Sequence, residues 1–393
     1  MIWDHARGWP AGGPRVLLTD CWLQNAGDAA IAIATQRMVE QLAPGAVVVH
    51  AAYGRAAVGH HYPDLRLAPP LDALLGTRWA EPAAGDREAG RAFVADADLV
   101  ISQGGGFLRE GYSPWARVDS LARAVDLTGS VALLGQTVGV FRTAFGRRLL
   151  GAGVLSRASV VLVRDAGSRA SAVELGADPA RVHLGTDFSL ELVGADLGAG
   201  PTAPPADPGT VGVVLSDHVV PGESADRGLL AARFLAAVLE RSGDRPVTAW
   251  SSSQGVPGDS DDDVVARTAV ERLPAHQRDR VTVPAGHLDA YDLYRWSAAF
   301  GSLVSMRFHP ALLAAAQGIP SVLAMSDPKV AFFDGSPLRA RVVTGHDAAS
   351  ARHAAGLVLP TPGRADPRDL LGPVADRLAV NRRVVADLLA GLG

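Results

Sequence analysis

The chain has 393 residues, of which 48% are hydrophobic and 20% charged, a composition typical of globular rather than disordered or fibrous proteins. At roughly 150 residues per domain, this length predicts two or three domains. Its 37 basic and 41 acidic side chains leave a net charge of −4. This balance argues against a nucleic-acid-binding protein, because such proteins normally carry a strongly basic domain.

Other global features indicate the cellular compartment. Cys21 is the only cysteine, so an intramolecular disulfide or a cysteine-based metal cluster is excluded. The first 14 residues lack the charged-then-apolar order of a signal peptide. The sequence has no run of about 18 consecutive apolar residues, so no transmembrane helix is predicted. We therefore expect a cytoplasmic protein with no integral membrane segment.

In the first half of the chain, short apolar runs alternate with helical stretches. A helix is expected over Ala29–Leu42, and strands are expected over Val16–Thr19, Val47–His50, Asp98–Ser102, Val131–Gly135 and Val160–Val163. Near-continuous apolar strands that alternate with helices are typical of parallel sheets buried on both faces. Residues 1–193 are therefore predicted to form an N-terminal α/β domain.

Residues 194–210, rich in Pro, Gly and Ala, are predicted to be a linker. The alternation resumes over 211–366, with strands expected at Val211–Leu215, Val247–Trp250, Leu303–Ser305 and Ser321–Met325, and helices at Gly228–Arg241, Asp261–Leu273 and Pro310–Gln317. Residues 367–393 are predicted to be an amphipathic helix that packs back on the N-terminal domain. The simplest architecture is α/β, with two Rossmann-like doubly wound domains and a central cleft. In such sheets, ligands bind beyond the carboxyl ends of the strands.

One motif follows the first strand of the first domain. Gly27 in Asn25-Ala-Gly-Asp28 permits a tight turn, and the helix N-terminus beyond it could hold an anion. Capping of the helix by Asn25 and Asp28 is the favoured interpretation of this motif alone.

Glycine-rich stretches follow two further strands. Gln103 precedes Gly104, Gly105 and Gly106, which we expect to form a flexible loop that approaches a ligand or makes a sharp bend. The spacing is not the dinucleotide-binding G-x-G-x-x-G. Gln136 lies in a similar stretch, Gly135–Gly139, for which the same two roles, ligand approach or a sharp bend, remain open.

Arg164 comes directly after a strand, where it could bind a carboxylate or phosphate through two parallel hydrogen bonds. Alternatively, Arg164 and Asp165 form a local charge pattern at a helix start. The residues alone leave both interpretations open.

The most specific motif contains Arg307 and His309, two residues apart at the end of an apolar strand, so both are expected to point to one side. Pro310 suits the first turn of the following helix. A cation beside a histidine predicts an anion site with a group that exchanges protons near neutral pH. Lys329, the only lysine, follows two elements later.

No Walker sequence, G-x-S-x-G elbow or H-E-x-x-H motif is present, and no metal site is predicted. The acidic run of Asp259, Asp261, Asp262 and Asp263 could bind a cation, but it is better explained as an exposed helix start.

Together, the motifs resemble the polysaccharide pyruvyl transferase family. The order N-x-G-D-x-A-I, G-G-G, G-Q-x-x-G, V-R-D-x-x-S, M-R-x-H-x-x-x-x-A-x-x-x-G-I-P and D-P-K runs from about Asn25 to Lys329. The resemblance implies a GT-B-like fold and transfer of the pyruvyl group of phosphoenolpyruvate to two hydroxyls of a sugar. The products would be a pyruvate ketal and phosphate, and the reaction would need no cofactor beyond its donor substrate.

The resemblance also implies residue roles. The family's essential basic residues match Arg164, Arg307 and His309, which we expect to be catalytic: the arginines would bind the donor's carboxylate and phosphate, and His309 would exchange the proton. Substrate binding is expected of the remaining motif residues, which are Asn25, Gly27, Asp28, Gln103, Gly104, Gly105, Gly106, Gln136 and Lys329. The N-terminal domain would face the acceptor, and the C-terminal domain the donor.

Two departures from the family pattern leave the acceptor open. Val140 stands where the family often has Pro, and Ser326 where it often has Tyr. The expected partners are phosphoenolpyruvate and a sugar, glycan or glycolipid acceptor, and a homo-oligomer is compatible with the sequence. The alternatives are a GT-B glycosyltransferase with a nucleotide-sugar donor, and a family member that modifies a small natural product or only binds it.

Overall fold

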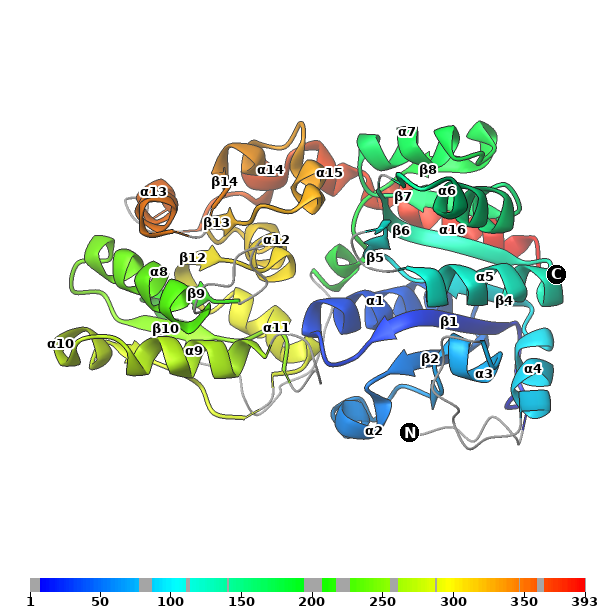
Figure 1. The fold of residues 1–393 in the computed structure, drawn as a ribbon, viewed down its shortest axis with the longest axis horizontal. Coiled ribbons are helices and arrows are strands. Elements are labelled where there is room, and N and C mark those ends of the chain that lie inside the picture. Colours follow the sequence, from blue (N-terminus) through cyan, green and yellow to red (C-terminus); the bar gives the residue numbers. More distant parts are fainter. Residues whose placement is uncertain are drawn as a thin grey trace. The chain divides into compact units, whose positions relative to one another are not determined.

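The structure, a computed structural model, describes residues 8–77, 87–110, 114–139, 141–193, 207–216, 227–254, 261–286, 288–345, 347–358 and 364–392. The chain divides into two compact units (Figure 1). Unit 1 comprises Met1–Leu23, Asp28–Glu191 and Asp376–Gly393, and unit 2 comprises Gln24–Gly27 and Leu192–Ala375. Each unit contains one sheet flanked by helices, and every strand pair among the described residues is parallel.

The sheet of unit 1 has the order β3-β2-β1-β4-β6-β7-β8, with β5 paired to β6. Its strands are β1 (Arg15–Trp22), β2 (Val47–Tyr53), β3 (Leu67–Ala68), β4 (Leu99–Ser102), β5 (Gly105–Leu108), β6 (Val131–Val138), β7 (Val160–Val163) and β8 (Val182–Leu184). The chain runs from β1 toward one edge and then returns to place β4 on the other side of β1. The carboxyl ends of β1 and β4 therefore form the topological switch point, where sheets of this kind bind ligands.

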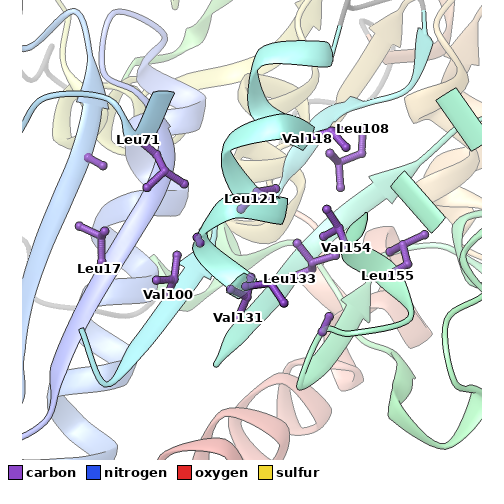
Figure 2. Close-up of a cluster of buried hydrophobic side chains, with 14 of the residues drawn as sticks. Leu17, Leu71, Val100, Leu108, Val118, Leu121, Val131, Leu133, Val154 and Leu155 are labelled. Atoms are coloured by element: carbon purple, nitrogen blue, oxygen red, sulfur yellow. The ribbon is translucent and has the colours of Figure 1, made fainter. Parts of the chain in front are cut away.

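Helices cover the sheet of unit 1. They are α1 (Ala26–Leu42), α2 (Arg55–Val58), α3 (Leu71–Leu74), α4 (Arg87–Ala95), α5 (Trp115–Thr128), α6 (Ala144–Leu150), α7 (Ala166–Glu174) and α16 (Leu378–Ala390). Strand residues such as Leu17, Val100 and Leu133 pack against Leu121 of α5 and the short π-helical turn Gly151–Leu155 (Figure 2). Burial of these apolar side chains is the main force that holds the helices on the sheet.

The sheet of unit 2 has the order β11-β10-β9-β12-β13-β14. Its strands are β9 (Asp207–Val214), β10 (Val247–Trp250), β11 (Val281–Thr282), β12 (Phe300–Ser305), β13 (Ser321–Ala324) and β14 (Val342–Val343). Its helices are α8 (Arg227–Arg241), α9 (Asp262–Glu271), α10 (Ala275–Arg278), α11 (Ala290–Ser297), α12 (Phe308–Ala316), α13 (Ala348–Val358), α14 (Pro367–Leu371) and α15 (Pro373–Asp376). Here β9 and β12 are the two strands at which the chain order reverses.

This architecture confirms the predicted fold class of two doubly wound α/β units. One prediction is wrong: Gly105 and Gly106 are not in a flexible loop but begin β5, a short strand that pairs with β6. Another difference concerns Gln24–Gly27, which belongs to unit 2 because its backbone is hydrogen-bonded to residues after β10. In that pairing, Ala26 N donates to Ser252 O at 2.9 Å.

The predicted linker and final helix also differ in detail from the structure. Of residues 194–210, 194–206 lie outside the described residues, and the remainder begins β9. The stretch 367–393 contains three helices rather than one, and the first break falls at Gly372, which has a positive φ of 52° and is followed by a proline. Only the part from Asp376 onward belongs to unit 1. None of the described helices has the length and apolar character needed to cross a lipid bilayer.

Candidate functional site

In unit 2, Arg307 and His309 lie at the topological switch point formed by β9 and β12. Met306 N donates to Val214 O at 2.9 Å, which holds the end of β12 against β9. Arg307 is the N-cap residue of α12, and His309 lies in its first turn, so the two residues do not share a strand as predicted. The strand ends at Ser305, whose Oγ accepts a hydrogen bond from Arg307 N and donates one to Arg307 O, turning the chain into the helix.

A buried carboxylate holds the guanidinium of Arg307. Nη2 lies 2.6 Å from Oδ1 of Asp262, and Nε lies 3.1 Å from its Oδ2. The Asp262 side chain is 0% exposed and that of Arg307 15%. This two-point contact fixes the orientation of a side chain that would otherwise sample many rotamers.

The acidic run that contains Asp262 does start a helix, as the sequence analysis favoured. Asp261 caps α9, accepting a hydrogen bond from Asp263 N at 3.0 Å. Asp263 pairs with Arg267 one turn later. Asp259 lies outside the described residues. Among the described members of the run, Asp262 is buried, and its partnership with Arg307 was not predicted.

His309 packs against Gly27. An added β-carbon at Gly27 would overlap the imidazole ring, so only glycine fits there without displacing His309. Asn25 precedes α1, and its Oδ1 accepts a hydrogen bond from Gly27 N at 3.0 Å, which confirms the capping interpretation for Asn25. The motif therefore does two things: it starts a helix, and it provides the surface on which the His309 ring lies.

Lys329 lies near the same part of unit 2. It belongs to the 3-10 helix Pro328–Phe333, which Asp327 caps through a 2.8 Å hydrogen bond from Lys329 N. Phe332 and Phe333 of this helix pack against Phe308, with ring centroids 5.3 and 5.2 Å away. Unit 2 thus combines Gly27, Arg307 and His309 into one constellation, with Lys329 on the adjoining helix.

In unit 1, Arg164 is buried at the end of β7. Its side chain is 1% exposed, and Nη1 lies 2.5 Å from Oδ2 of Asp187, which is 0% exposed. Its Nε donates to Oγ1 of Thr137 at 2.7 Å. Asp165 caps α7 by accepting a hydrogen bond from Ser168 N, so it is not the charge partner of Arg164. The ion partner of Arg164, Asp187, was missed by the sequence analysis.

The glycine-rich stretches of unit 1 bring two glutamines to the sheet centre. Gln136 Nε2 donates to Gln103 O, and Gln103 Nε2 donates to Asp28 O at 3.2 Å. A β-carbon at Gly104 would lie 2.8 Å from Gly135 O, so the backbone between β4 and β5 approaches β6 more closely than another residue would allow. Val140, one of the departures from the family pattern, lies outside the described residues.

Comparison with known proteins identifies the family. A model of the family described as polysaccharide pyruvyl transferase matches residues 25–327. The chain belongs to the polysaccharide pyruvyl transferase family. The family is a transferase family, and the match spans both units. No curated protein matches the chain in sequence.

Solved structures with a similar fold include UDP-N-acetylglucosamine 2-epimerases and a protein solved with UDP-glucose. The UDP-N-acetylglucosamine 2-epimerase of Rickettsia bellii has 9% identity and a TM-score of 0.61, over 96% of this chain and 97% of that one. The Neisseria meningitidis enzyme, bound to UDP-GlcNAc, has 10% identity and a TM-score of 0.60, over 96% and 100%. Anabaena HepE, in complex with UDP-glucose, has 13% identity and a TM-score of 0.58, over 96% and 100%. The fold of this pyruvyl transferase family member is therefore GT-B-like.

Proposed function

We propose that the protein transfers the pyruvyl group of phosphoenolpyruvate to two hydroxyls of a sugar or glycan precursor. A pyruvate ketal forms and phosphate is released. The observation that carries the proposal is the constellation of Arg307 and His309 at the unit 2 switch point, in a chain that belongs to the pyruvyl transferase family. A cation held in a fixed orientation beside an imidazole suits a substrate that is an anion and must gain a proton.

The proposed chemistry uses both groups. Arg307 donates hydrogen bonds to the anionic donor, and the first-turn N–H groups of α12 add a favourable dipole. His309 gives a proton to the methylene carbon of phosphoenolpyruvate while an acceptor hydroxyl attacks the neighbouring carbon, and the proton that this hydroxyl loses returns to His309. When the second hydroxyl attacks, the bond from carbon to phosphate oxygen breaks, and the leaving phosphate gains the second hydroxyl proton. Two hydroxyl protons are thus balanced by one new C–H bond and one protonated phosphate.

Arg164 enters this proposal in a different role from that of Arg307. Because it is buried and contacts Thr137 and Asp187, we propose that it positions the ends of β6 and β7 rather than binding the donor directly. Lys329, on the helix that adjoins His309, is proposed as a further donor-binding cation. No cofactor or metal enters the proposed reaction.

The decisive experiment measures phosphate release from phosphoenolpyruvate with a panel of mono- and disaccharide acceptors. His309→Ala should lose at least about a hundredfold in turnover, because a positioned proton donor contributes about 10²–10⁴-fold. His276→Ala is the matched control, since His276 is an exposed histidine of the same unit, on α10. Near-normal turnover in His309→Ala would exclude His309 as the proton donor.

A second candidate function is glycosyl transfer from a nucleotide sugar, favoured by the shared fold of proteins solved with UDP-sugars. Thermal melting with phosphoenolpyruvate, UDP-GlcNAc and UDP-glucose separates the two functions. A ligand at about a hundred times its dissociation constant adds roughly 2.7 kcal/mol of stability, which is readily seen. Stabilisation by phosphoenolpyruvate alone supports pyruvyl transfer, and stabilisation by a UDP-sugar alone supports glycosyl transfer.

A further inference from the structure

Asp262, the first residue of α9, is a buried acidic residue of unit 2. A carboxylate that is removed from water is costly unless hydrogen bonds and an opposite charge hold it, so its partners indicate what it does. Asp262 contacts two segments of unit 2 that are distant from each other in the sequence. These segments are the start of α12 and the turn that follows β10.

The first partner is Arg307, the N-cap residue of α12. Oδ1 of Asp262 lies 2.6 Å from Nη2 of Arg307, and Oδ2 lies 3.1 Å from Nε, so the two oxygens lie along one edge of the guanidinium. Contact at two points fixes both the plane and the direction of the group, which contact at one point does not. The orientation of Arg307 is therefore set by a side chain 45 residues earlier in the chain.

The second partner is the turn after β10. Asp262 N donates to Ser253 O at 2.9 Å, and Ser252 N donates to Oδ2 of Asp262 at 3.3 Å. Both serines are buried, and Ser253 also pairs with Asn25 in an isolated antiparallel bridge. Asp262 thus holds this turn through its backbone and through the same carboxylate that binds Arg307.

The turn after β10 also holds the segment that lies against His309. Ser252 O accepts a hydrogen bond from Ala26 N at 2.9 Å. The next residue is Gly27, where an added β-carbon would overlap the His309 ring. A series of contacts therefore runs from Asp262 through Ser252 and Ala26 to the imidazole.

We propose that Asp262 is a positioning residue that orients Arg307 and, through Ser252, holds Gly27 in place against His309. The two functional side chains would then be aligned by one shared partner. The inference rests on the proposed function, in which Arg307 binds phosphoenolpyruvate and His309 exchanges the proton. Such alignment matters because a shift of about 1 Å in a reacting group can reduce the rate about a hundredfold.

Asp262→Asn tests the contact with Arg307. An asparagine at this position can accept hydrogen bonds from Ser252 N and Arg307 Nε, but its NH2 group then faces Nη2, a donor against a donor. Phosphoenolpyruvate should bind about tenfold more weakly in isothermal titration calorimetry, because the ligand must then order a mobile guanidinium. Removal of a negative charge beside an anion site would by itself tighten binding, so weaker binding reports the loss of orientation.

The effect of Asp262→Asn should depend on Arg307. In an Arg307→Ala protein, Asp262→Asn should weaken phosphoenolpyruvate binding no further, because the group that Asp262 orients is gone. The matched control is Asp263→Asn, which removes the same charge from the next residue, where Asp263 pairs with Arg267. This control should bind phosphoenolpyruvate as the wild type does. Unchanged or tighter binding in Asp262→Asn, or an equal loss in the Arg307→Ala protein, would overturn the proposal.

The contact with Ser252 is tested by turnover. Asp262→Asn retains an acceptor for Ser252 N, so its turnover at saturating phosphoenolpyruvate should stay within about threefold of the wild type while KM rises. Asp262→Ala has no such acceptor, so Gly27 and His309 are held less firmly and turnover should fall about tenfold or more. A role in folding alone would lower the melting temperature of both variants without separating KM from turnover. Equal turnover in the two variants would contradict the link from Asp262 to His309.

A measurement without ligand separates this inference from the proposed function. NMR of protein with isotope-labelled arginine and histidine should show a changed Nε–H signal of Arg307 in Asp262→Asn, and changed ring signals of His309 in Asp262→Ala. Asp263→Asn should change neither. Unchanged signals in both Asp262 variants would overturn the positioning role. A wild type that neither binds phosphoenolpyruvate nor releases phosphate from it would instead contradict the proposed function, and the NMR comparison would still decide the role of Asp262.

Discussion

Gly27 and His309 lie so close together that a methyl group on Gly27 would overlap the imidazole ring. Gly27 lies in the first turn of α1, in the stretch of chain that belongs to unit 2 although it follows β1 of unit 1. The motif Asn25-Ala-Gly-Asp28 therefore contributes to the His309 site from far away in the sequence. Glycine is required at position 27 because the His309 ring leaves no room for a side chain, and not because of the backbone dihedral angles of Gly27.

Gly27→Ala is predicted to displace His309 and reduce turnover by about a hundredfold, because a shift of about 1 Å in a reacting group has an effect of that size. The measurement is phosphate release from phosphoenolpyruvate. The matched control is Gly356→Ala in α13, where an added β-carbon meets nothing within 4 Å. That control should gain about 0.5–1 kcal/mol in stability and keep full activity. Full activity in Gly27→Ala would show that the position of His309 is unimportant.

Arg307→Lys is predicted to weaken phosphoenolpyruvate binding about tenfold to a hundredfold while retaining the charge. A lysine ammonium cannot make the two-point contact of Nε and Nη2 with Asp262 and also present fixed donors to an anion. Isothermal titration calorimetry with phosphoenolpyruvate measures the change. Arg267→Lys, which alters an exposed ion pair with Asp263 on the neighbouring helix, is the control and should bind as the wild type does. Equal affinities in the two variants would contradict a directional role for Arg307.

Central strands such as β7 and β10 were predictable from the sequence, for a physical reason. Parallel strands buried on both faces are continuous apolar runs, so Val160–Val163 and Val247–Trp250 have the bounds that the structure gives β7 and β10. The edge strands β3, β11 and β14 have only two residues each, too few to produce a pattern. β5 was mistaken for a loop because its glycines are typical of loops, whereas here a β-carbon on Gly105 would overlap the ring of Phe107 in the same strand.

For the candidate site, the motif residues were predictable and their partners were not. Arg307 and His309 stand together in the sequence, but Asp262 lies 45 residues before Arg307, and Asp187 lies 23 residues after Arg164. Each aspartate acquires its role only when the sheet brings its element beside the arginine. The positive φ of Asp20 in β1, 66°, likewise leaves no mark in the sequence.

The pair Arg164–Asp187 is predicted to act as a unit in stability. Arg164→Ala and Asp187→Ala should each lower the free energy of unfolding by about 3–5 kcal/mol, because each leaves a buried charge without its partner. The double variant should be less destabilised than the sum of the two, with a coupling of about 0.5–3 kcal/mol. Urea unfolding of the four proteins measures the cycle. Strict additivity would mean that the contact contributes nothing beyond packing.

A buried histidine in unit 1 is predicted to make stability depend on pH. Gln36 Nε2 donates to Glu40, so Oε1 of Gln36 accepts from Nε2 of His50 at 2.6 Å. Nδ1 of His50 lies 3.7 Å from Sγ of Cys21, whose thiol donates to Leu18 O at 3.6 Å. Burial, aided by the charge of Arg66, lowers the pKa of His50 to about 3.

In the unfolded chain, His50 takes up its proton near pH 6.5, so between about pH 6.5 and pH 3 the unfolded state holds more protons than the folded state. The contribution of His50 to stability is therefore complete above about pH 6.5 and declines as the pH falls. Between pH 7.5 and 4.5 this amounts to about 2–3 kcal/mol. His50→Gln, which retains polar groups but does not titrate, should lose that much less stability over this range in urea unfolding. His276→Gln, at an exposed site, should behave as the wild type does, and the same acid loss in His50→Gln would contradict the assignment.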